Sequence, residues 1–93
     1  MDKKIEWALA GLENEVSRLA HMPSNHNYRK PGSLLFRKLV RICSLAKLAN
    51  VEYHTLVEQV TPVIMHIDKM SVSRAEQQLK RAWHGSTPAN YGE

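Results

Sequence analysis

The side chains whose type and spacing point most clearly to a chemistry are the basic residues in the first half of this sequence. Residues 16–51 contain no aspartate or glutamate but seven basic residues, which are Arg18, Arg29, Lys30, Arg37, Lys38, Arg41 and Lys47. Arginine carries a planar fork of N–H donors that fits phosphate oxygens, and several cations on one ridge bind a polyanion by releasing its condensed counterions. The pattern therefore favours an anionic partner, with nucleic acid as the first hypothesis.

Helical spacing gathers part of this charge on one ridge. Arg37 and Arg41 are four residues apart and share one face of a helix, with Lys38 to one side and Lys47 to the other. The apolar residues of the same stretch lie on the opposite face, and they are Leu35, Leu39, Ile42 and Ala46. The cations must therefore point to solvent or to a partner.

The polar stretch before this helix adds hydrogen-bonding groups. The amide of Asn27 could bond base edges, and Tyr28 offers an aromatic ring on which a base could stack. The predicted contact set for nucleic acid or another anionic partner is Asn27, Tyr28, Arg29, Lys30, Arg37, Lys38, Arg41 and Lys47. Two other interpretations stay open: a solvated helix face without a partner, and a protein-interaction module, such as an inhibitor or adaptor, that docks on an acidic protein surface.

Residue types that support catalysis or metal binding are present, but their spacing is wrong for a site. No two of the five histidines lie three or four residues apart on one helix, so we expect no metal site. The single cysteine, Cys43, falls on the apolar side of its helix, where a small buried hydrophobe is expected, although a Cys–His dyad stays open. We therefore expect a non-enzymatic protein without a cofactor. Trp7 and Trp83 are expected to close the core rather than to frame a partner groove.

Four helical segments must position these side chains. Ile5, Leu9, Leu12, Val16 and Leu19 predict a first helix over residues 2–20. A second helix should begin after a Ser33 cap, end near Leu48, and be followed by a left-handed Asn50. A third should open at Val51, and a Ser73-x-x-Glu76 capping box predicts a last helix ending at His84 and Gly85.

Pro62 is the awkward position of the third segment, because proline inside a helix removes a hydrogen bond and clashes with the preceding turn. Thr61 is an acceptable N-cap and proline is favoured at a first helical position, so the pair predicts a kinked restart. The fold class is therefore all-α: a small four-helix bundle, or a kinked five-helix bundle.

Length and charge set the remaining limits. The 93 residues allow one domain, predicted over residues 1–85, with a flexible tail over residues 86–93. The net charge is +4, but residues 16–51 carry +7 and the remainder −3, so positive and negative charge are separated along the chain. A single cysteine and the lack of a long apolar run favour a cytoplasmic protein that does not enter a membrane. A chain of this size gains buried area by pairing, so a homodimer is possible.

One further pattern spans residues 8–88. It begins with an amphipathic helix and a polar turn. These are followed by Leu34-Leu35-Phe36-x-x-Leu39, the link Ala46-x-Leu48-Ala49-Asn50-Val51-Glu52, another helix, and Ser73-x-x-Glu76 before Lys80-Arg81-Ala82-Trp83. This order resembles the helical region that follows the catalytic module in phage and plasmid primase–polymerases. That family usually has Gly-x-Arg-Asn where this chain reads Asn25-His26-Asn27-Tyr28-Arg29-Lys30. The resemblance implies a non-catalytic bundle that helps hold single-stranded template or nucleotide, with phosphate contacts at Arg29, Lys30, Arg37 and Arg41.

Overall fold

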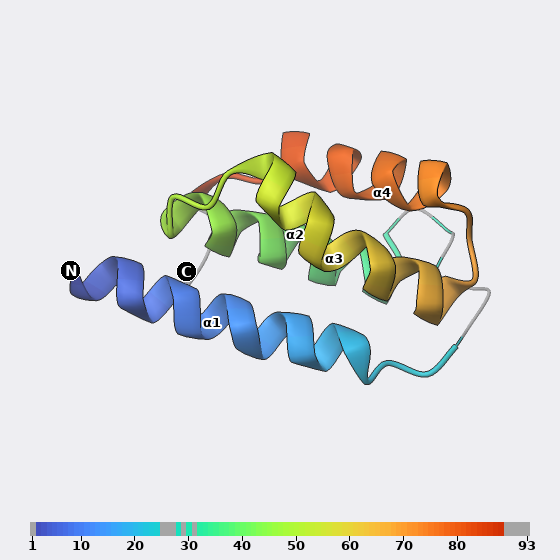
Figure 1. The fold of residues 1–93 in the computed structure, drawn as a ribbon, viewed down its shortest axis with the longest axis horizontal. Coiled ribbons are helices and arrows are strands. Elements are labelled where there is room, and N and C mark those ends of the chain that lie inside the picture. The colour runs from blue at the N-terminus through green and yellow to red at the C-terminus, as the bar shows by residue number, and fades with distance from the viewer. Residues whose placement is uncertain (1, 25–27, 29, 31, 89–93) are drawn as a thin grey trace.

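The computed structural model describes residues 2–24, 28, 30 and 32–88, and these residues form four helices. The helices are α1 (Lys3–Ala20), α2 (Leu34–Leu48), α3 (Tyr53–Asp68) and α4 (Val72–His84), shown in Figure 1. No strand occurs in this part of the chain. The prediction of an all-α bundle is confirmed, in its four-helix form.

The helices enclose one apolar core. α1 packs mainly on α2, α4 packs on both α2 and α3, and α1 and α3 touch along a shorter stretch. Among the described residues, α1 and α4 do not touch, and α2 and α3 touch over only a few residues, so each of these two pairs lies diagonally across the bundle. In Figure 1, α1 and α3 run from left to right, and α2 and α4 run the opposite way.

The first helix begins as predicted but turns a different edge toward the core. Asp2 caps it by accepting a hydrogen bond from the Lys4 amide at 2.9 Å. The buried residues are Ala8, Leu12, Glu15 and Leu19, while three members of the predicted stripe, Ile5, Leu9 and Val16, are only half-buried. The reason is that α1 packs more extensively on α2 than on α3, which moves the buried face by about one residue.

The second helix matches its prediction. The Ser33 hydroxyl accepts a hydrogen bond from the Phe36 amide at 3.2 Å and donates one to the Tyr28 carbonyl at 2.8 Å. The helix ends at Leu48, and Asn50 takes the predicted left-handed conformation with φ of 60°. The expected apolar stripe is fully buried, and it consists of Leu35, Leu39, Ile42 and Ala46.

The third helix contradicts the predicted restart at Thr61 and Pro62. It runs without interruption through Pro62, and Thr61 is buried inside it rather than acting as a cap. Pro62 and Glu58 are both exposed, so water can hydrate the Glu58 carbonyl that loses its helical donor. The kinked five-helix alternative is therefore wrong.

The last helix begins two residues earlier than the capping box predicted. Ser71, not Ser73, is the N-cap, and its hydroxyl accepts a hydrogen bond from the Arg74 amide at 3.3 Å. A left-handed Lys69, with φ of 50°, turns the chain after α3, and Met70 is buried directly before the cap. This short turn leaves Ser73 inside the first turn of α4. Gly85 ends the helix as predicted.

The two tryptophans differ in their surroundings. Trp83 is half-buried and packs against the Tyr53 ring, with centroids 5.3 Å apart and planes tilted by 58°. Trp7 is 54% exposed, so the prediction that both tryptophans close the core is wrong for Trp7. Ala8, one residue further along α1, occupies the core position instead.

The end of the described chain stays close to the bundle. Ser86 is buried, and its hydroxyl donates a hydrogen bond to the Trp83 carbonyl at 2.8 Å. Residues 89–93 lie outside the described part, so the flexible tail over residues 86–93 stays a prediction. Within the described chain, no helix combines the length and apolarity needed to cross a membrane.

Candidate functional site

The predicted ridge lies on the outer side of α2, where Arg37 and Arg41 are both exposed. They border a shallow hollow of about 420 Å³ whose lining residues we call the α2 surface: Leu34, Phe36, Arg37, Lys38, Val40 and Arg41. Leu34 is 46% exposed, so the surface offers apolar contact area as well as charge. α2 contains no aspartate or glutamate, so no acidic side chain of this helix offsets the charge of the two arginines.

Lys38 belongs to this surface but is held by an acid from α1. Its Nζ lies 3.5 Å from Oε2 of Glu15, and the Lys38 side chain is only 17% exposed. The other carboxylate oxygen of Glu15 accepts a hydrogen bond from Arg18 Nη1 at 3.2 Å. Sequence spacing missed this arrangement because Glu15 and Lys38 lie on different helices.

Lys47 does not join the ridge as predicted. Its Nζ donates hydrogen bonds to the carbonyls of Trp83, at 2.6 Å, and Ser86, at 2.8 Å. The same nitrogen lies 4.7 Å from the centre of the Trp83 ring, a cation–π distance. Lys47 therefore ties the end of α2 to the end of α4, and its charge is satisfied inside the protein.

The predicted contact residues before α2 divide into three groups. Tyr28 is only 8% exposed and belongs to the core, so the interpretation of its ring as a base-stacking surface is wrong. The Ser33 hydroxyl bonds the Tyr28 carbonyl, which holds the Tyr28 backbone beside the start of α2. Lys30 is exposed. Asn27 and Arg29 lie outside the described residues.

Cys43 is fully buried, as its place on the apolar side of α2 predicted. Burial raises the pKa of its thiol to about 12, although the nearby Lys47 charge partly opposes this rise. The thiol therefore keeps its proton at neutral pH and is a poor nucleophile. Among the residues that the structure describes, no three His, Cys, Asp or Glu side chains gather in a way that could hold a metal ion.

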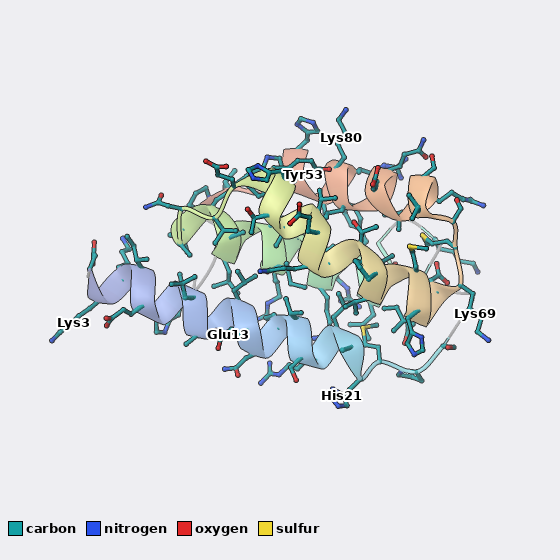
Figure 2. The ribbon with its side chains drawn as sticks, viewed as in Figure 1. Lys3, Glu13, His21, Tyr53, Lys69 and Lys80 are labelled. Atoms are coloured by element: carbon teal, nitrogen blue, oxygen red, sulfur yellow. The ribbon has the colours of Figure 1, made fainter. Side chains whose placement is uncertain are left out.

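A second hollow, of about 490 Å³, lies between α1 and α3 and was not predicted. Its lining residues are Leu9, Leu12, Glu13, Val16, Ser17, Val51, Thr55 and Gln59. Glu13, labelled on α1 in Figure 2, is the one charged residue among them. The half-buried Leu9 and Val16 line it because the core-facing edge of α1 is turned toward α2.

Comparison with known proteins adds no assignment. The chain matches no protein-family model, no curated protein and no solved structure. The resemblance to the helical region of primase–polymerases therefore stays a prediction.

Proposed function

We propose that this chain is a non-catalytic nucleic-acid-binding helical module whose α2 surface contacts phosphates. One observation carries the proposal: Arg37 and Arg41 are exposed one turn apart on a helix whose opposite face is fully buried. Both guanidinium groups are carried by one helix, so little backbone conformational entropy is lost when they bind. A cytoplasmic role in phage or plasmid replication belongs to the same proposal, since the primase–polymerase resemblance suggests it.

The surroundings of the pair support phosphate binding in two further ways. Lys30 is exposed shortly before α2, and its charge adds to that of the arginines. The first turn of α2 contains no acidic residue, so the partial positive charge of the helix N-terminus is not neutralised within the helix. The nearby acid Glu15 is buried and already interacts with Arg18 and Lys38.

Titration of labelled oligonucleotides at several salt concentrations tests the proposal. About five phosphate contacts give a slope of log K against log salt near −3.5 for single strands or −4.5 for duplex. Replacing both arginines, Arg37→Gln and Arg41→Gln, should reduce the magnitude of that slope by roughly 1.4 or 1.8, respectively. Glutamine keeps helix propensity, so the fold should be retained.

The matched control is the pair Lys80→Gln and Arg81→Gln. These residues are exposed on α4, and Figure 2 places Lys80 on the side of α4 that is remote from α1. The control removes the same amount of charge, so it separates a local contact from a general loss of positive charge. No binding near 50 mM salt, or equal losses in both pairs, would contradict the proposal.

A second candidate function is docking on an acidic protein surface, and the exposed Leu34 favours it. Protein interfaces bury an apolar centre with a polar rim, and the α2 surface has apolar residues beside its arginines. Leu34→Ser discriminates the two candidates. It should leave oligonucleotide binding unchanged, whereas it should weaken capture of a protein partner from a nuclease-treated lysate.

A further inference from the structure

The buried carboxylate of Glu15 joins basic residues from two helices. Arg18 on α1 and Lys38 on α2 each approach one of its oxygens, at 3.2 Å and 3.5 Å. Lys38 also lines the α2 surface beside Arg37 and Arg41. Arg18 is therefore linked through the Glu15 carboxylate to Lys38 of the α2 surface, although it stands 20 positions before Lys38 in the sequence.

The three members of this group differ in what they can offer a ligand. The Glu15 side chain is 4% exposed and that of Lys38 17%, whereas the Arg18 side chain is 65% exposed. A guanidinium has five N–H donors, and the described hydrogen bond to Glu15 uses Nη1 alone. Arg18 thus keeps donors directed to solvent, while Lys38 contributes mainly charge.

We infer that the phosphate-contacting surface crosses from α2 onto α1, with Arg18 as a further contact residue and Glu15 as the residue that positions it. The inference depends on the proposed function, because it names an additional residue of the same site. Glu15 neutralises part of the local charge, so the group of Arg18, Glu15 and Lys38 keeps a net charge of +1. A nucleic-acid backbone that contacts Arg37 and Arg41 would meet this group where α1 packs against α2.

Oligonucleotide titration of Arg18→Gln tests the inference, with Lys80→Gln as the control of equal charge change. Arg18→Gln should weaken binding severalfold at low salt and reduce the magnitude of the salt slope by roughly 0.7 for single strands. Lys80→Gln should leave the slope unchanged. Arg18 is exposed, so the variant should fold, which circular dichroism checks.

A double-mutant cycle of Arg18→Gln with Glu15→Gln tests the positioning role. If Glu15 positions Arg18, the loss caused by Arg18→Gln should be smaller in the Glu15→Gln background than in the unaltered chain. A purely structural role for Glu15 would lower stability but leave the two binding losses equal. Equal losses would therefore overturn the positioning role.

The outcomes separate this inference from the proposed function. Binding that depends on Arg37 and Arg41 but responds equally to Arg18→Gln and Lys80→Gln overturns the inference alone. Absence of oligonucleotide binding by the unaltered chain overturns both. Loss of binding in Arg18→Gln but not in Lys80→Gln supports a surface formed by two helices.

Discussion

The Lys47 amino group and the Trp83 carbonyl oxygen are 2.6 Å apart, and this contact joins the ends of two parallel helices. The same amino group bonds the carbonyl of buried Ser86. A cation near the last carbonyls of a helix also interacts favourably with the helix dipole. Lys47 is thus a structural cation, in contrast to the exposed Arg37 and Arg41 on the same helix.

Replacing Lys47 with methionine should destabilise the fold by about 1–3 kcal/mol. Methionine retains the apolar stem but removes the donor, so the buried carbonyl of Ser86 loses its partner. Urea denaturation followed by circular dichroism measures the change. Lys80→Met, at an exposed position of α4, is the control and should change stability by less than about 0.5 kcal/mol. Equal stability of the two variants would contradict the structural role of Lys47.

Replacing Glu15 with glutamine should lower the free energy of unfolding by about 1–3 kcal/mol. The reason is that Lys38, with 17% of its side chain exposed, loses the charge that compensates its burial. Combining Glu15→Gln with Lys38→Met should recover part of the loss, because the double variant leaves no unpaired charge. Chemical denaturation of all three variants gives the coupling, and strictly additive losses would argue against an ion pair.

The stability of the fold should fall with increasing pH above about 9 because of Cys43. Burial raises the pKa of this thiol from 9.0 to about 12, so the unfolded chain loses the proton first and binds fewer protons between those values. The contribution reaches about 1.4 kcal/mol per pH unit within that window. Burial also raises the pKa of Tyr53, which adds in the same direction. Cys43→Ala should flatten the pH dependence of unfolding, and an unchanged slope would contradict the assignment.

The Cys43 thiol should also resist a thiol reagent at pH 8 until the chain unfolds. The side chain is fully buried and protonated, and a thiolate is the reactive form. The reaction rate with and without urea gives the protection. Rapid labelling of the folded chain would show that α2 opens readily.

Pro62→Ala should stabilise the fold by about 2 kcal/mol. Alanine restores a backbone donor inside α3 and removes the proline clash. These gains outweigh the conformational entropy that the unfolded chain regains when proline is replaced. Thermal and urea denaturation measure the difference. A kinked restart at Thr61 would instead favour proline at its first position, so destabilisation would indicate that the helix is interrupted.

Local sequence signals predicted much of the secondary structure. The periodic stripe of α2, its Ser33 cap and the left-handed Asn50 all depend on residues within one or two turns. The α4 cap was misplaced because Ser71 and Ser73 are both capping residues, and the buried Met70 and left-handed Lys69 decided between them. The uninterrupted α3 could not be predicted either, because packing outweighs the local cost of Pro62.

The candidate site was likewise predicted from the sequence only in part. The acid-free charge and the four-residue spacing of Arg37 and Arg41 were determined by the sequence, because helical geometry alone places them opposite the buried stripe. Only the tertiary structure decided that Lys47 binds carbonyls as far as 39 residues away and that Glu15 reaches Lys38 on another helix. Charges are visible in a sequence, but their partners are set by how helices pack. Packing thus decides which cations remain exposed for a ligand.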